Sequence, residues 1–217
     1  MKKPLLLAAL LCSALVLVNC DLFGSKLDFF PTTVGSTWTY QGWMTYEQVD
    51  DPDTLFSTRT KTEVTEKTTL FSGEEVSEFV NTDSTHTFVP FETTSVNVSR
   101  SYVRQDGDYI LAYDSKDDAQ PDTALALPLE EGKTWTIYSN ADTSVTALVL
   151  KRETVTVAAG EFKDCWKLEV TISTGGLGQK TYWWYADGIG RVRNYVESTN
   201  SGMKTVLENE LVSSDVK

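Results

Sequence analysis

Apolar and polar side chains alternate with a period of two along most of the chain after residue 35. In residues 36–48, Trp38, Tyr40 and Met44 fall on one side of this pattern, while Thr, Gln and Glu side chains occupy most of the other. A strand with such a pattern buries one face and exposes the other. No stretch in this part of the sequence keeps the apolar period of an amphipathic helix, about 3.6 residues. The pattern therefore predicts an all-β protein.

The same alternation predicts a series of further strands separated by short breaks. We expect strands at about residues 58–70, 75–81, 85–91, 96–104, 109–113, 134–139, 145–158, 162–173, 179–186, 190–198 and 203–212. Pairs that favour tight turns lie between many of them, namely Ser72-Gly73, Asp106-Gly107, Ala159-Gly160, Gly175-Gly176, Asp187-Gly188 and Ser201-Gly202. Strands joined by such turns pair with their neighbours in the chain, which predicts an antiparallel meander.

An internal repeat divides this meander into two similar halves. Residues 31–40 (PTTVGSTWTY) match residues 128–137 (PLEEGKTWTI), with Pro, Gly, Thr, Trp and Thr at equivalent positions. We therefore predict a first β-meander repeat at 30–115, an acidic linker loop at 116–124 and a second β-meander repeat at 125–217. The expected architecture is a curved sheet or half-barrel, with a β-sandwich as the alternative.

The N-terminus follows a different pattern. Met1, Lys2 and Lys3 precede an apolar run over residues 5–18, which is the layout of a secretory signal. The run is too short to cross a bilayer comfortably as a helix, since that takes about 20 residues. Residues 1–19 are therefore predicted to be a signal peptide that is removed.

The signal ends in Leu17-Val18-Asn19-Cys20, which resembles the lipobox of bacterial lipoprotein precursors. The resemblance implies that Cys20 becomes the first residue of the mature chain and carries fatty acyl chains such as palmitate. Two or three acyl chains hold a protein at a membrane almost permanently. We expect residues 20–29 to form a lipidated tether and the folded domain to face the periplasm or the cell exterior, within the bacterial cell envelope.

The charge of the chain restricts its partners. The sequence has 31 acidic and 19 basic residues, a formal net charge of −12, and loses Lys2 and Lys3 with the signal. Nucleic acid binding needs basic side chains that replace counterions, and no basic stripe interleaved with aromatic residues is present in the sequence. We predict no nucleic acid partner, and we interpret the acidity as a means of solubility rather than of cation binding.

The cysteines and the single histidine offer little chemistry. Cys12 leaves with the signal and Cys20 is the proposed anchor, so Cys165 has no disulfide partner within the mature chain. Strict alternation places Cys165 on a polar face, although a bulge near Asp164 would turn it inward. A nucleophilic cysteine needs a basic neighbour, and His86 is distant in sequence.

Known catalytic, nucleotide-binding and metal-binding motifs are missing from the sequence. A single histidine rules out a histidine-based metal cluster, and the acidic runs lack the glycine and terminal glutamate of a calcium loop. We therefore expect no enzyme activity, no cofactor and no metal. A glycan hydrolase, which needs only two carboxylates, remains the alternative that the residues favour least.

Aromatic residues provide the candidate binding site. Alternation forces the strand Tyr182-Trp183-Trp184-Tyr185 to place two rings on each face, so one pair must face solvent, another layer or a ligand. We predict these four residues as an apolar ligand-binding surface. Trp38 and Trp135 recur at equivalent positions of the repeat, which favours core packing over ligand stacking.

The sequence resembles a loose class of uncharacterised bacterial envelope lipoproteins in three places. These are Phe-Pro-x-x-x-Gly-x-x-Trp-x-Tyr at 30–40, Val-x-Ala-Gly-x-Phe-x-x-Cys at 157–165 and Tyr-Trp-x-Tyr-Ala-x-Gly-x-Gly-x-Val at 182–192. The resemblance implies a strongly curved antiparallel sheet and no particular chemistry.

Together these features predict a lipid-anchored envelope protein that acts as a non-catalytic binding module. The ligand favoured by the aromatic strand is an apolar molecule carried in a curved sheet. The alternative is a surface that docks another envelope protein or a polysaccharide.

Overall fold

The computed structural model describes residues 28–48, 51–88, 91–175, 177–200 and 203–217, which form twelve β-strands and no helix. The strands are β1 (Thr37–Gln48), β2 (Asp51–Thr69), β3 (Glu75–Thr87), β4 (Thr93–Asp106), β5 (Tyr109–Tyr113), β6 (Asp122–Ala126), β7 (Thr134–Ser139), β8 (Thr143–Val157), β9 (Gly160–Thr174), β10 (Leu177–Ala186), β11 (Gly190–Asn200) and β12 (Met203–Asp215). The all-β prediction is confirmed. Across the described residues, no helix is long and apolar enough to cross a membrane. The predicted signal peptide and Cys20 lie outside the described residues.

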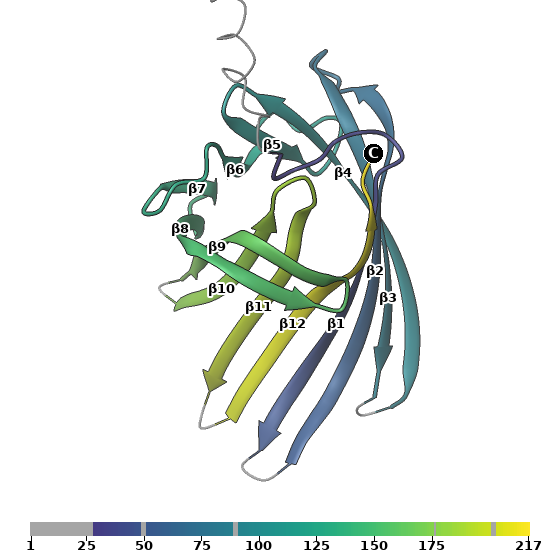
Figure 1. The fold of residues 1–217 in the computed structure, drawn as a ribbon, viewed down its shortest axis with the longest axis vertical. Helices are drawn as coiled ribbons and strands as arrows, with labels where there is room; N and C mark the ends of the chain where they lie inside the picture. The colour runs from purple at the N-terminus through teal and green to yellow at the C-terminus, as the bar shows by residue number, and fades with distance from the viewer. Residues whose placement is uncertain (1–27, 49–50, 89–90, 176, 201–202) are drawn as a thin grey trace, which may run out of the picture.

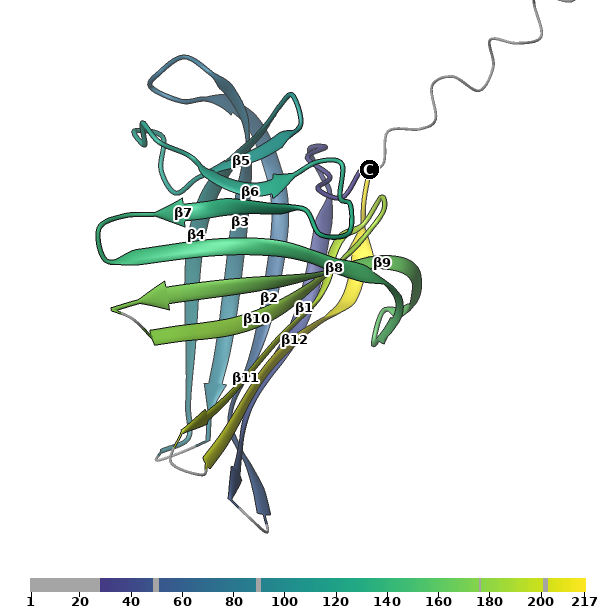
Figure 2. The same ribbon diagram turned by 90° about the vertical axis from the view of Figure 1, so that its left-hand side faces the viewer.

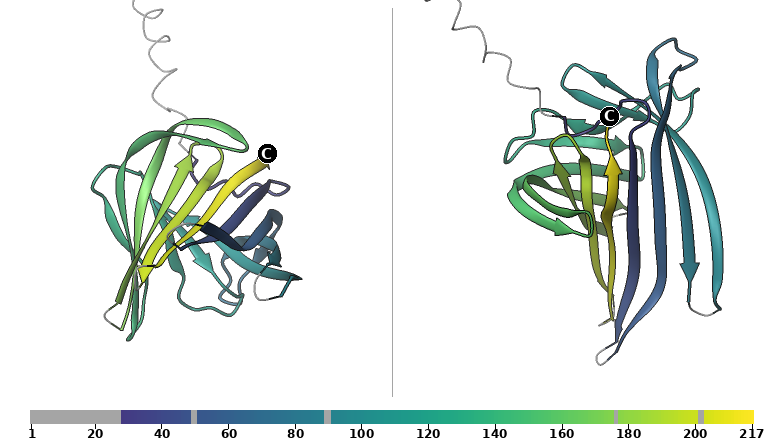
Figure 3. Two further views of the ribbon diagram at one scale, coloured as in Figure 1. Left: turned by 90° about the horizontal axis from the view of Figure 1, so that it is seen from below. Right: turned by 45° about the vertical axis from the view of Figure 1, so that its right-hand side comes forward.

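The twelve strands form one antiparallel sheet in the order β6-β5-β4-β3-β2-β1-β12-β11-β10-β9-β8-β7. Strands pair with their neighbours in the chain, and the β1–β12 pairing joins the two halves (Figure 1). Figure 2 shows β7–β10 crossing the direction of β2–β4 steeply, so the sheet is strongly curved. Seen from below, it curls around an interior (Figure 3). The predicted meander with a half-barrel shape is confirmed, and a single sheet takes the place of the alternative sandwich. Equivalence of the two halves in three dimensions stays a prediction.

One predicted break in the strands is wrong. The pattern suggested separate strands at 75–81 and 85–91, but β3 is continuous from Glu75 to Thr87. Thr62 Oγ1 of β2 donates to Asn81 Oδ1 at 2.7 Å, and Thr60 Oγ1 donates to Asp83 Oδ1 at 2.5 Å. Because these cross-strand partners satisfy the polar side chains, the strand continues through a segment that reads as a loop.

The segments that flank the predicted repeats take part in the folded body. β6 begins at Asp122, inside the predicted linker at 116–124, and pairs with β5. At the N-terminal end, Phe29 is buried in the main core, and the Asp28 amide donates to Asp187 Oδ1 at 2.7 Å. The last residues of the predicted tether therefore pack against the turn between β10 and β11.

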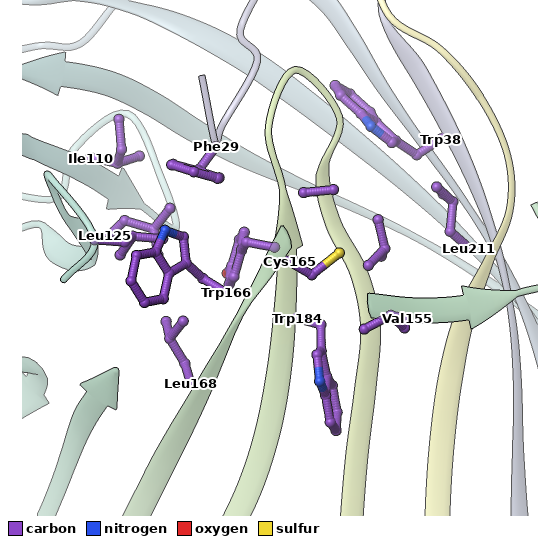
Figure 4. Packing of buried hydrophobic residues seen from close by; sticks show 14 of the residues in the cluster. Phe29, Trp38, Ile110, Leu125, Val155, Cys165, Trp166, Leu168, Trp184 and Leu211 are labelled. Atoms are coloured by element: carbon purple, nitrogen blue, oxygen red, sulfur yellow. The ribbon is translucent and has the colours of Figure 1, made fainter. Parts of the chain in front are cut away.

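The main core draws on both halves of the sheet and fills the end of the half-barrel near the start of β1 (Figure 4). Its largest buried members include Phe29, Trp38, Phe79, Ile110, Leu125, Trp166, Leu168, Trp184, Tyr185 and Leu211. Trp38 stacks on Phe79 with 6.2 Å between ring centroids, and its Nε1 donates to the Ile189 carbonyl at 2.7 Å. The prediction that Trp38 packs in the core is confirmed. Trp135 is half-buried against the same core, and its Nε1 donates to the Thr123 carbonyl at 3.0 Å.

The β8–β9 hairpin bends back onto the sheet. Its pairing shifts register between Glu153 and Val155, and Asp164 adopts a φ of 55°. At the tip, the Ala159 amide donates to the Leu211 carbonyl of β12 at 2.9 Å. The irregularity turns Cys165 inward, where it is 0% exposed. Cys165 therefore lies beneath its own hairpin rather than on a polar surface.

Candidate functional site

The aromatic strand β10 places its four rings on opposite faces of the sheet, as alternation requires. Trp183 pairs with Leu168 of β9 and Tyr185 pairs with Trp166 of β9, so these four residues share one side of the sheet. Tyr182 and Trp184 point to the other side. We call the side that carries Trp38, Tyr40, Trp183 and Tyr185 the inner face, and the opposite side the outer face.

The outer pair is occupied by the protein's own side chains. Trp184 is only 5% exposed, and its Nε1 donates to Glu153 Oε1 at 2.7 Å. The Lys167 ammonium lies 4.9 Å and the Arg193 guanidinium 5.0 Å from the Trp184 ring, and Lys167 also lies 4.7 Å from the Tyr182 ring. Cation–π contacts and one hydrogen bond thus cover Trp184. This half of the predicted aromatic site is a structural cluster.

Ion pairs extend the outer cluster. Glu153 pairs with Lys151 at 2.7 Å, and Arg193 Nε donates to Glu208 Oε1 at 2.6 Å. Burial raises the pKa of Glu153, but hydrogen bonds from Lys151 and Trp184 outweigh it and lower the pKa below its usual value. The outer face therefore has charges that compensate one another.

The inner face carries a cavity of about 180 Å³ whose lining includes five aromatic rings. Its wall includes Phe30, Trp38, Tyr40, Phe79, Val103, Tyr185 and Ile189, with Thr62, Asn81, Ser101 and Arg191 beside them. Residues of β4 and β10 line the same space although five strands separate them in the sheet. Only the concave side of a curved sheet brings such distant strands together. The inner face is therefore the interior of the half-barrel.

A second cavity, of about 260 Å³, continues from the first and is polar. Tyr40, Thr62, Asn81 and Arg191 line both spaces, and the second adds Thr60, Asp83, Ser99 and Asn209. An aromatic compartment thus opens into one rich in hydroxyl and amide groups. Such a combination of apolar lining with a few polar groups is typical of small-molecule sites.

Gly42 on β1 makes the polar compartment possible. A Cβ atom at this position would lie 1.7 Å from Asn209 Oδ1 and 2.5 Å from Thr58 Oγ1. The missing side chain lets Asn209 of β12 and Thr58 of β2 meet across β1, at 3.4 Å. Glycine inside a strand usually weakens the strand. At position 42 it allows the side chains of the two neighbouring strands to approach each other closely.

Two tyrosines of the inner face are held in their neutral form. Burial raises the pKa of Tyr40 to about 12, although Arg191 acts in the opposite direction. Burial likewise raises the pKa of Tyr185. The Tyr40 hydroxyl donates to the Arg191 carbonyl at 3.0 Å. This hydrogen bond ties β1 to the start of β11 at the junction of the two compartments.

A third cavity, of about 480 Å³, lies near Trp166 and has a charged rim. Phe29, Leu127 and Leu129 form part of its wall together with Asp108, Glu130, Glu131 and Arg152. The Arg152 guanidinium lies 4.5 Å from the Trp166 ring and so covers it. Three carboxylates around the opening make this hollow a poor site for an apolar ligand.

Residues 112–203 match the sequence model of a family of unknown function, DUF3108. The match begins in β5 and ends in β12, and includes β10 and β11. No curated protein matches this chain.

Solved structures are similar to the chain, among them two of bacterial proteins. One is described as a "putative exported protein with YmcC-like fold" from Bacteroides fragilis NCTC 9343. It has 18% sequence identity and a TM-score of 0.43, and the similarity covers 88% of this chain and 100% of that one. The other, a "putative lipoprotein" from Parabacteroides distasonis ATCC 8503, has 15% identity and a TM-score of 0.42, with the same coverage.

Other reactive or metal-ligating side chains of the described residues are buried, bonded to neighbours or not grouped together. Burial raises the pKa of the Cys165 thiol to about 11, helped by Asp164 and Glu153. His86 lies 3.1 Å from Thr94 Oγ1 and 3.3 Å from Glu92. Across the described ranges, no group of three or more His, Cys, Asp or Glu side chains is arranged to hold a metal ion.

The sequence pattern indicated only part of the inner face, and ligand binding by the four predicted residues stays a prediction. It named Trp183 and Tyr185, which lie on the inner face, together with Tyr182 and Trp184, which do not. It missed Tyr40, Asn81, Asp83, Arg191 and Asn209. The available signal was polar residues at positions where alternation predicts inward-facing side chains, such as Asn81 and Asp83.

Proposed function

We propose that this protein is a lipid-anchored, non-catalytic protein of the bacterial cell envelope that binds an apolar molecule with a polar group inside its half-barrel. The observation that carries this proposal is the pair of connected compartments on the inner face, one aromatic and one polar. Cys20 of the lipobox-like motif supplies the anchor, eight residues before Asp28, which the structure shows bonded to the turn between β10 and β11.

The shape of the sheet supports binding of a molecule with a chain. Aromatic rings from β1, β3 and β10 surround the apolar compartment, so a hydrocarbon chain placed there leaves water. The polar compartment then receives the other end of the molecule, where Thr, Asn and Ser side chains offer hydrogen bonds. A purely apolar ligand would make no hydrogen bond with the side-chain amides of Asn81 and Asn209, which favours an amphipathic one.

A second candidate function is docking of an extended protein segment at the edge of β4. β5 pairs only with residues 102–106 of β4, so no described strand covers the outer edge of residues 93–101. Val96 is 66% and Val98 52% exposed there. A long, nearly uncharged edge is a template for another strand.

Native mass spectrometry distinguishes the two candidates. Both core clusters lie between Phe29 and Val216, so residues 21–217 keep the folded body and lose only the proposed signal and anchor. We expect this form, secreted to the periplasm of a host cell and purified gently, to carry extra mass of lipid size that disappears on unfolding. A clean mass of the protein alone would contradict the proposal.

A matched pair of variants locates the bound molecule. Ser101→Phe fills the apolar compartment from β4, whereas Arg100→Phe places the same ring on the outer face of the same strand. We expect the first variant to lose the extra mass and the second to keep it. Loss in both variants, or in neither, would place the molecule elsewhere.

A further inference from the structure

Arg191 lies where the aromatic and polar compartments meet. It is the second residue of β11 and lines both spaces. Its guanidinium carbon lies 5.9 Å from the centre of the Tyr40 ring and 5.7 Å from that of the Trp183 ring. Rings from β1 and β10 therefore hold the cation on the inner face through cation–π contacts.

These contacts use the face of the guanidinium and leave its N–H groups for another partner. A guanidinium has five N–H donors in one plane. Within the described residues, no side chain or carbonyl accepts a hydrogen bond from the Arg191 guanidinium, and no carboxylate forms an ion pair with it. Yet the chain has 31 acidic residues against 19 basic ones. Arg191 is therefore an exposed cation of this cavity that aromatic rings position and that pairs with no described carboxylate.

The neighbours of Arg191 in the polar compartment are compatible with an anion. Tyr40, Thr62, Asn81 and Asn209 are neutral, and the side-chain amides of Asn81 and Asn209 can donate hydrogen bonds. The hydroxyl hydrogens of Tyr40 and Thr62 already go to the Arg191 carbonyl and to Asn81 Oδ1. Asp83 is the carboxylate of this wall, and it accepts a hydrogen bond from Thr60. Its other oxygen atom suits a hydroxyl or an ammonium group beside the anion.

We infer that Arg191 binds the acidic head group, a carboxylate or a phosphate, of a lipid-like ligand whose chain lies in the aromatic compartment. The inference rests on the proposed function and names the ligand class for that site. Planar N–H pairs match the oxygen pairs of carboxylates and phosphates, and such charge-assisted hydrogen bonds are the strong ones in proteins. Because the chain is acidic overall, the anion needs this one local cation to overcome the general repulsion.

The test compares ligands that differ only in charge. Palmitate and methyl palmitate share one chain, and displacement of a fluorescent fatty acid from residues 21–217, cleared of co-purifying lipid, gives their dissociation constants. We expect palmitate to bind at least about tenfold more tightly than the ester, the range of hydrogen bonds to charged groups. Lysophosphatidic acid, measured in the same way, shows whether a phosphate is preferred to a carboxylate.

Two arginine variants complete the test. Arg191→Gln should remove the preference for palmitate and leave the ester unchanged, because only the head group loses its contact. Arg193→Gln, two residues away on the outer face, should keep the preference. Thermal unfolding of both variants checks that the fold is intact, and Arg191→Lys should recover part of the preference by restoring the charge.

The outcomes separate this inference from the proposed function. Equal affinity for palmitate and its ester in the unchanged protein, or a preference that survives Arg191→Gln, would overturn the role of Arg191 while ligand binding stands. No measurable binding of any of the three lipids would instead contradict the proposed function itself.

Discussion

Arg191 and Arg193 lie two residues apart on one strand but face opposite sides of the sheet. The cause is a register shift in the β10–β11 pairing, where Trp184 pairs with Arg193 and Tyr185 with Arg191. Regular alternation would place both arginines on one face. Bulges of this kind re-aim side chains and are common beside functional sites. One extra residue thus separates a structural arginine from one that is open to a ligand.

The two environments differ in how far the protein satisfies its own groups. On the outer face, Arg193 has Glu208 as its ion-pair partner, and Trp184 is covered by charged side chains and bonded to Glu153. On the inner face, Arg191 has aromatic neighbours but no described carboxylate, and Trp183 is only half-buried. On the outer face, the hydrogen bonds and ion pairs within the protein stabilise the fold. On the inner face, the N–H groups of Arg191 remain available to a ligand.

Truncating each tryptophan should give the largest difference between the faces. We expect Trp184→Ala to lower the free energy of unfolding by about 3–5 kcal/mol, since it removes a buried ring and its hydrogen bond to Glu153. Trp183→Ala should cost about 1–2 kcal/mol, because the ring is half exposed, but should weaken lipid binding. Denaturant unfolding and lipid titration of both variants measure these effects. Equal losses of stability would contradict the distinction.

The reactivity of Cys165 tests how firmly the tip of the β8–β9 hairpin is closed over this buried thiol. Because its pKa is raised to about 11, the thiolate at pH 8 is rarer by about a hundredfold than for a thiol of pKa 9. We expect a thiol reagent to react far more slowly with the native protein than with the protein in denaturant. Rapid reaction of the native form would show that the β8–β9 tip opens readily.

A smaller effect on the free energy of unfolding should come from the Glu153 carboxylate on the outer face. The lowered pKa of Glu153 means that its contribution to stability is present above the unfolded pKa, near 4.5, and is lost as the pH falls through the folded pKa. Glu153→Gln should therefore lower the free energy of unfolding by up to about 1 kcal/mol at pH 7 and by less at pH 3. Glu161→Gln, at an exposed position of β9, is the control. A difference that grows on acidification would contradict this sign.

Much of the fold could be predicted because it depends on local pattern. Alternation identified the strands, and turn pairs such as Ser72-Gly73 and Asp106-Gly107 fall where Gly73 and Gly107 take φ values of 103° and 58°. The split of β3 was wrong because Asn81 and Asp83 are satisfied by threonines of β2, which no local pattern reveals. The entry of β6 into the predicted linker depends in the same way on its pairing with β5.

The site was harder to predict because irregularities of the sheet decide which face a residue occupies. Alternation shows that two of the four rings in Tyr182–Tyr185 share a face, but it does not show which pair faces the interior. Arg191 reaches the inner face only through the register shift. The side chain of Asn209 has room only because Gly42, on the neighbouring strand β1, has no side chain. Both features depend on pairing between strands rather than on the sequence of one strand.

Photo-crosslinking with a diazirine-bearing fatty acid tests the central claim most directly. The reagent labels whatever side chains surround the bound chain, and peptide mass spectrometry then locates the labels. The account predicts labels on inner-face residues of the aromatic compartment, such as Phe79, Val103 and Tyr185, and fewer labels in Ser101→Phe. Labels confined to the outer face, around Tyr182 and Lys167, would contradict it.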